Sequence, residues 1–281
     1  MFELSLAKCL AVAVIAFGCE YMDSTLGMGY GTTLTPVLML LGFQPIFIVP
    51  AVLSSELVSG LLAGVFHHWH GNVNLMPRST RLSVVAHKVQ TLGLTESFKR
   101  GTPRHLKVAI LLSAIGVVGT VGAVFVAVSI PPVMLEFYIG ALVLGMGATI
   151  LLCRNRQFGF SWRKVSLLGL LASFNKGMSG GGYGPVVTGG QILSGVDGRS
   201  AVGITSVAEG LTCLVGVVVY GLVSGNIFAW KLTPFIMTGA ILSVPLSALS
   251  VKKLDTRRLT LAIGIFTTIL GTVTLGRIFL S

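Results

Sequence analysis

The chain has 281 residues, of which 53% are hydrophobic and only 10% are charged, and its mean hydropathy is +0.88. A soluble domain carries roughly a quarter of its residues as charges, so this composition excludes an ordinary soluble protein. The net charge of +11 comes from basic residues between long apolar runs. Such loops are typical of contact with anionic lipid rather than with nucleic acid. The sequence therefore predicts an all-α polytopic membrane protein.

In chain order, the apolar sequence alternates between short pieces and longer runs. The shorter pieces flank two glycine-rich breaks and are predicted to be half-helices: 5–19, 32–41, 165–174 and 186–193. The longer runs can cross a hydrocarbon core of about 30 Å, which needs about 20 residues. They are 42–66, 108–130, 133–152, 200–225, 232–251 and 259–276.

The sequence also contains an internal repeat at an offset of 153 residues. Gly27-Met28-Gly29-Tyr30-Gly31 matches Gly180-Gly181-Gly182-Tyr183-Gly184, and Glu56 matches Glu209. We expect two related halves, each a short glycine-broken helical hairpin followed by three transmembrane helices. The predicted units are a first repeat over 1–152 with a basic insertion at about 75–105, a linker over 153–164, and a second repeat over 165–281.

Charge placement predicts the orientation of these halves. The segments 67–107, 153–164 and 252–258 together hold 15 of the 20 basic residues. Placing all three on the cytoplasmic side follows the positive-inside rule and makes the two repeats inverted with respect to each other. A parallel duplication would place 252–258 outside. The predicted location is a cell membrane of the bacterial inner-membrane type.

The glycine motifs are candidates for binding a small anion. Closely spaced glycines permit positive φ, so backbone N–H groups can converge on a ligand, and a helix N-terminus attracts negative charge. The alternative, that these glycines only allow close helix packing, stays open. The predicted substrate-binding residues are Gly27, Gly29, Tyr30, Gly31, Asn175, Lys176, Ser179, Gly180, Gly181, Gly182, Tyr183 and Gly184.

Ionisable residues inside apolar sequence are functional candidates by default. The repeat-equivalent of Lys176 is Asp23, so the two could form an ion pair that substrate breaks, or each could extend to an interface. Glu56 and Glu209 could carry protons that couple transport to a gradient. Alternatively, each protonated glutamate could hydrogen-bond the unwound backbone beside it.

The chain resembles the sulfite exporter TauE/SafE family, also called the toluene sulfonate uptake permease family. The resemblance rests on Asn175–Pro185, on Gly27–Gly31 with Pro36, and on the Gly-Asn turns after the glutamate-bearing segments. It implies export or uptake of small sulfur-containing or organic anions. The first motif departs from the family pattern, because Met28 interrupts the glycines and no proline directly follows Gly31.

The sequence therefore predicts a secondary transporter, not an enzyme, for a small anion of the sulfite, thiosulfate or organosulfonate type, with proton coupling left open. Its other partner is the lipid bilayer. An anion channel and a membrane scaffold or receptor are the alternatives.

Two further patterns bear on other functions. Gly177-Met178-Ser179-Gly180 matches an intramembrane serine protease motif, but all five histidines lie between 67 and 105, and a serine nucleophile needs a base within reach. The histidines of 67–70, expected at a membrane–water interface, lack carboxylate or cysteine partners. We therefore predict no metal site and no cofactor.

Overall fold

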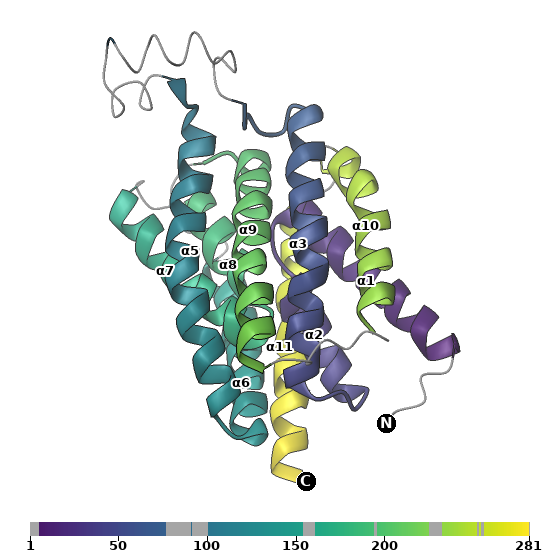
Figure 1. Cartoon of the computed structure of the whole chain (residues 1–281). Helices are drawn as coiled ribbons and strands as arrows, with labels where there is room; N and C mark the ends of the chain where they lie inside the picture. Colours follow the sequence, from purple (N-terminus) through teal and green to yellow (C-terminus); the bar gives the residue numbers. More distant parts are fainter. Residues whose placement is uncertain are drawn as a thin grey trace.

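The computed structural model of the chain describes residues 6–76, 91, 101–153, 161–193, 196–224, 232–251, 253 and 256–280. Within these residues the chain forms ten helices and no strand, which confirms the predicted all-α architecture (Figure 1). The helices are α1 Leu6–Leu26, α2 Tyr30–Leu40, α3 Pro45–Trp69, α5 Arg104–Ser129, α6 Pro132–Cys153, α7 Trp162–Ser179, α8 Tyr183–Leu193, α9 Gly198–Ser224, α10 Thr233–Ser250 and α11 Thr256–Leu280.

Among the described residues, six helices are long and apolar enough to cross a membrane, namely α1, α3, α5, α6, α9 and α10. Five of them coincide with predicted spans, and α1 differs from its prediction. The short piece expected over 5–19 continues to Leu26, because Glu20 and Asp23, which interrupt the apolar pattern, are buried inside the bundle. Helix α7 likewise extends beyond the predicted end at 174 through the buried Lys176.

Side-chain burial in the bundle differs from that in a soluble protein. Large apolar residues such as Val118, Leu167 and Leu222 are exposed on the outside, whereas many hydroxyl groups, including those of Thr35 and Ser55, are fully buried. This distribution fits a lipid environment, because lipid solvates an apolar exterior and polar groups are favoured inside the bundle.

The order of elements repeats along the chain. Helices α2 and α8 begin at Tyr30 and Tyr183, and α3 and α9 begin at Pro45 and Gly198, in both cases 153 residues apart. Helix α1 packs on α10 as α7 packs on α5, while α3 packs on α9 and α6 on α11. Figure 1 shows α3 and α9 side by side and running in opposite directions. The inverted relation of the halves across a membrane stays a prediction. Most of the basic insertion and of the 153–164 linker lies outside the described residues.

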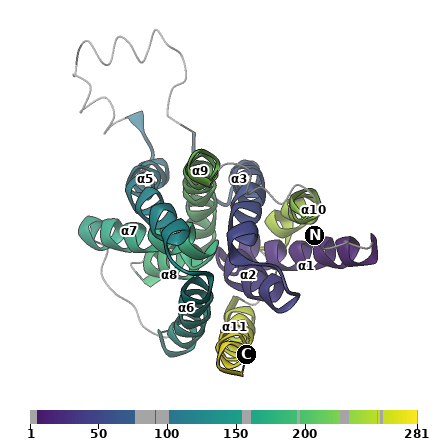
Figure 2. The same ribbon diagram turned by 60° about the horizontal axis from the view of Figure 1, so that its bottom comes forward.

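The two glycine breaks pack directly against each other in the interior, where Figure 2 places the short helices α2 and α8 between the longer ones. Gly27 and Gly180 adopt positive φ angles of 68° and 72°, which end α1 and α7. A Cβ on Gly31 would collide with the Gly180 carbonyl, and one on Gly184 would collide with the Gly27 carbonyl. These contacts are equivalent under the repeat. The packing role that the sequence left open is thus present, and the binding role stays a prediction.

Replacing Gly184 by alanine should destabilise the fold, because the new Cβ would overlap backbone of the other break. Overpacking of this kind costs about 1–3 kcal/mol. Gly189→Ala in the same helix is the matched control, since a Cβ there has nothing within 4 Å. We expect the unfolding temperature in detergent to fall for Gly184→Ala and to hold or rise for Gly189→Ala. Equal unfolding temperatures would contradict the close backbone contact.

Candidate functional site

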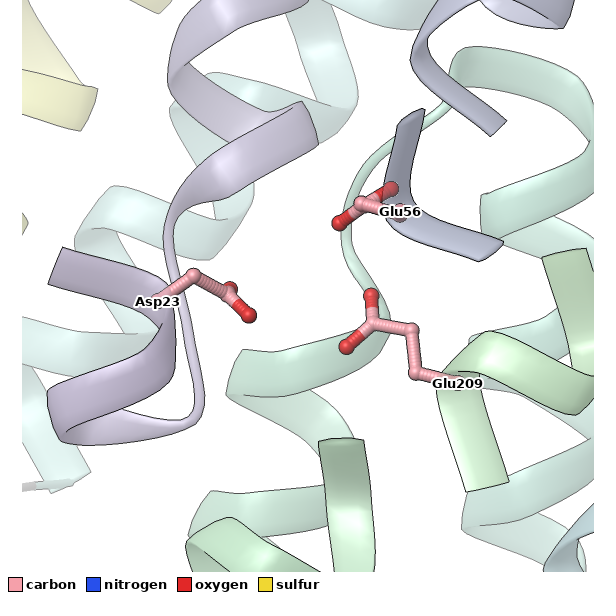
Figure 3. A group of neighbouring side chains, drawn as sticks. All are labelled: Asp23, Glu56 and Glu209. Atoms are coloured by element: carbon pink, nitrogen blue, oxygen red, sulfur yellow. The ribbon is translucent and has the colours of Figure 1, made fainter. Parts of the chain in front are cut away.

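Four ionisable side chains meet beside the glycine breaks. Asp23 comes from α1, Glu56 from α3, Lys176 from α7 and Glu209 from α9, and all four are at most 7% exposed. Carboxylate oxygens of the three acidic residues lie within 4.8 Å of one another, and Figure 3 shows their carboxyl groups turned toward a common space. We call these four residues the charged centre. Both halves of the chain contribute to it.

Lys176 is shared between two glutamates at equivalent positions of the repeat. Its Nζ donates to Glu209 Oε1 at 2.7 Å and also donates to Glu56 Oε2. In the described part of the chain, no other lysine or arginine is buried. A single ammonium therefore joins the glutamate-bearing helices α3 and α9, and it does so where water cannot solvate the three charges.

These contacts correct both sequence-based interpretations of Lys176. No ion pair joins Lys176 to Asp23 among the described side chains, and Lys176 does not extend to an interface, since it is fully buried. The repeat identifies equivalent positions, but equivalent residues need not be neighbours. Asp23 Oδ1 instead accepts a hydrogen bond of 3.2 Å from the backbone N–H of Tyr30, the first residue of α2.

The glutamates have another partner than the unwound backbone that the structural alternative predicts for Glu56 and Glu209. Their partner in the structure is the Lys176 ammonium, and Glu56 Oε1 is buried without a hydrogen-bond partner among the described residues. A buried carboxylate oxygen without a donor is costly, so Glu56 is a position where a proton or a ligand can bind favourably.

Several backbone N–H groups of the breaks donate to other groups of the protein. Besides the Tyr30 contact with Asp23, the Gly182 N–H donates to Thr32 Oγ1 at 3.1 Å and the Gly181 N–H donates to Ser179 Oγ at 3.1 Å. The Asp23 carboxylate therefore lies at the N-terminus of α2, where the helix dipole favours negative charge. A substrate anion at this helix end would have to replace the Asp23 carboxylate.

The remaining predicted site residues surround this arrangement. The hydroxyls of Tyr30 and Ser55 are 2.7 Å apart, and the Tyr138 hydroxyl donates to Asn175 Oδ1 at 2.7 Å. Tyr183 is fully buried in the first turn of α8. The Ser179 hydroxyl donates to the Asn175 carbonyl at 2.8 Å, so it stabilises the end of α7 rather than pairing with a base.

Sequence analysis missed two members of this environment. Glu20 is 2% exposed, lies one helical turn before Asp23, and has no hydrogen-bond partner for Oε2 among the described residues. The Sγ atom of Cys213 lies 4.0 Å from Glu56 Oε2. The signal for Glu20 was present, because an acidic residue three positions from Asp23 shares its helix face. The predicted apolar segment 5–19 ends directly before this residue.

The histidines near the end of α3 bond to the protein backbone. The His67 side chain is fully buried, and Nε2 donates to the Ser24 carbonyl at 2.8 Å, while the position of these histidines relative to a membrane–water interface stays a prediction. His68 and His70 contact backbone carbonyls near the end of α3. Three converging carboxylates can also serve as ligands of a hard cation. In the charged centre, however, the Lys176 ammonium contacts two of those carboxylates.

Apolar spans around two glycine breaks in direct contact, with a buried charged centre, are typical of membrane transport proteins. A family model described as "Sulfite exporter TauE/SafE" matches residues 79–274, and the chain belongs to this family. Over 285 residues the chain is 25% identical to the "Probable membrane transporter protein YtnM" of Bacillus subtilis (strain 168), with 95% of this chain and 83% of the relative covered. No solved structure matches the chain significantly. The protein is a multi-pass membrane transporter and not an enzyme.

Lys176→Met should strongly lower the unfolding temperature in detergent, because Glu56 and Glu209 would lose their shared cation. Removing one partner of a buried ion pair costs about 3–5 kcal/mol. Adding Glu56→Gln and Glu209→Gln to this variant should recover most of the loss. Lys164→Met, at an exposed position of the same helix, is the control and should change little. A Lys176→Met protein as stable as the parent would contradict the shared ammonium.

Proposed function

We propose that the protein is a secondary transporter of a small anion, and that the charged centre is part of its substrate path. The observation that carries this proposal is the fully buried Lys176, shared by Glu56 and Glu209 beside the contact of the two glycine breaks. Buried charged groups beside broken helices are typical of transporter sites. The family description favours a sulfur oxyanion such as sulfite, with thiosulfate and organosulfonates as chemically related candidates.

The contacts of Asp23 support a specific mode of binding. Its carboxylate accepts a hydrogen bond from the Tyr30 N–H at the start of α2. The N-terminus of a helix is also a favourable position for a bound anion. A substrate oxyanion and the ionised Asp23 side chain therefore compete for one helix end. Protonation of Asp23 removes the competing negative charge, so the same event that neutralises Asp23 prepares the site for the substrate.

The excess of buried carboxyl groups over buried cations also supports proton coupling. Glu20, Asp23, Glu56 and Glu209 bring four buried carboxyl groups, while Lys176 is the single buried lysine or arginine among the described residues. Uncompensated buried charge is costly, and a carboxyl group avoids that cost by binding a proton. Because Lys176 contacts Glu56 and Glu209, we infer that Glu20 and Asp23 on α1 are the groups that carry protons with the anion.

The surroundings of the centre favour a carrier over a channel. The charged residues are at most 7% exposed, so the centre is closed to solvent. The opposite directions of α3 and α9 support two inverted halves that rock around this centre. We infer that the basic segments are cytoplasmic, as the positive-inside rule indicates for a bacterial inner membrane.

Transport of radiolabelled anions into proteoliposomes tests the substrate class. We expect sulfite, thiosulfate or sulfoacetate to be taken up faster than acetate, with saturation and with counterflow against unlabelled substrate. The triple variant Lys176→Met, Glu56→Gln, Glu209→Gln should lose this uptake while Lys164→Met retains it. Uptake that neither saturates nor supports counterflow would identify a channel, and equal uptake of acetate would overturn the sulfur-anion proposal.

A pH gradient across the proteoliposome membrane tests the coupling. An acidic external solution and a neutral internal solution should accelerate substrate uptake, because protons and the anion move inward together. Asp23→Asn and Glu20→Gln should abolish this acceleration while retaining counterflow, since exchange of substrate needs no net proton movement. Glu136→Gln is the matched control, because Glu136 lines a different pocket, outside the charged centre. A pH gradient without effect on the parent protein would contradict proton coupling.

A further inference from the structure

Two hydrogen bonds of the same kind occur at equivalent positions of the repeat. His67 Nε2 donates to the Ser24 carbonyl oxygen at 2.8 Å, and the Tyr220 hydroxyl donates to the Gly177 carbonyl oxygen at 2.8 Å. Both the donors (67 and 220) and the acceptors (24 and 177) are 153 residues apart. Each half of the chain therefore ties its glutamate-bearing helix to its own helix break, although the two donor side chains are chemically different.

The end of the broken helix explains why such a bond is needed. The Gly27 N–H donates to the Asp23 carbonyl at 2.5 Å, and the Gly180 N–H donates to the Lys176 carbonyl at 2.8 Å. The next carbonyl along each helix then belongs to the last turn, where helical N–H partners run out. A buried carbonyl needs a donor from elsewhere, and in both halves the donor is the side chain eleven residues after the glutamate.

The two bonds lie on opposite sides of the charged centre. Eleven residues of helix span about 16 Å at 1.5 Å per residue. Figure 1 shows that α3 and α9 run in opposite directions side by side. Because His67 follows Glu56 along α3 and Tyr220 follows Glu209 along α9, the two donors are displaced from their glutamates toward opposite ends of the bundle. The end of α3 that carries His67 leads into the segment that the charge pattern assigns to the cytoplasm.

The two bonds differ in how many further hydrogen bonds surround them. Around His67, the Asn72 amide donates to Nδ1 at 3.1 Å and lies 3.3 Å from the Ala248 carbonyl, while the Ser24 and Ser247 hydroxyls are 2.6 Å apart. The bond thus belongs to a network that joins α1, α3 and α10. Tyr220 is fully buried and makes its contact through one hydroxyl group. The His67 side is therefore the more extensively bonded of the two.

We propose that these bonds are the two latches of alternating access, an inference that rests on the proposed transport function. The inner latch is His67 with Ser24, and it closes the path toward the cytoplasm. The outer latch is Tyr220 with Gly177, and it closes the opposite path. Each latch holds the backbone directly after a charged residue, Asp23 or Lys176, so its release frees that residue on one side. Both latches are formed in this structure, in which the charged centre is buried from both sides.

Cys213 provides a reporter for this proposal, because it is fully buried and its Sγ lies 4.0 Å from Glu56 Oε2. In a protein whose other three cysteines are replaced by alanine, a membrane-impermeant thiosulfonate can be added to either face of oriented vesicles. Tyr220→Phe should raise the rate of Cys213 modification from the outer face about fivefold, the equilibrium equivalent of one ordinary hydrogen bond. The rate from the cytoplasmic face should not rise.

His67→Phe should have the opposite effect and raise the rate from the cytoplasmic face. His67→Gln retains an N–H donor and should return the rate toward that of the parent. If His67→Phe does not fold, Asn72→Ala serves as the second variant, because it removes the amide that bonds His67 Nδ1 and orients the ring, and it should also raise the rate from the cytoplasmic face. If these hydrogen bonds only stabilised the fold, the variants would change the rate of Cys213 modification from both faces by the same factor.

The outcomes separate this proposal from the transport function. Equal acceleration from both faces, acceleration from the wrong face, or no change in any variant would overturn the latches. If Cys213 of the parent reacts equally fast from both faces at once, as in an open pore, the carrier function fails and the latches fail with it. Selective effects of Tyr220→Phe and His67→Phe on opposite faces would support the proposal independently of the identity of the anion.

Discussion

The interaction on which the rest of the structure depends is the contact of one buried ammonium with two buried carboxylates. Lys176 can remain charged inside a lipid-embedded bundle only because Glu56 and Glu209 surround it, and these glutamates need Lys176 for the same reason. Since the three residues come from α3, α7 and α9, their contact fixes how both halves of the chain meet. The position of the glycine breaks then follows, because Lys176 lies in the last turn of α7.

The close contact of the breaks depends on the absence of side chains. Gly31 and Gly184 lie against backbone carbonyls of the opposite break, so only glycine allows this approach. This close approach brings the ends of two helices and their charged residues close together. The symmetry of this packing is not matched by symmetry of charge, because α1 carries Glu20 and Asp23 where α7 carries Ser173 and Lys176. One half supplies the cation and the other supplies the excess carboxyl groups.

This asymmetry connects the structure to the proposed function. A centre with more carboxyl groups than ammonium groups does not attract an anion until protons neutralise part of it. The Asp23 carboxylate at the start of α2 provides the direct link, since it bonds the N–H group that an oxyanion would use. The two latches add a second asymmetry, because a histidine network closes one side and a single tyrosine hydroxyl closes the other.

The sequence by itself determined the class of fold, the membrane environment and the repeat, because hydropathy and a fixed offset are properties of the chain alone. It also identified Asp23, Glu56, Lys176 and Glu209, since an ionisable residue inside an apolar segment is rare enough to be recognised. Their partners were decided only by tertiary structure. Lys176 pairs with two glutamates rather than with its repeat-equivalent Asp23, because contact depends on how four helices pack and not on equivalence in sequence. The burial of Glu20 and His67 was decided in the same way. Both belong to segments whose polarity indicates an end or an interface, and the packing of helices in three dimensions covers their side chains.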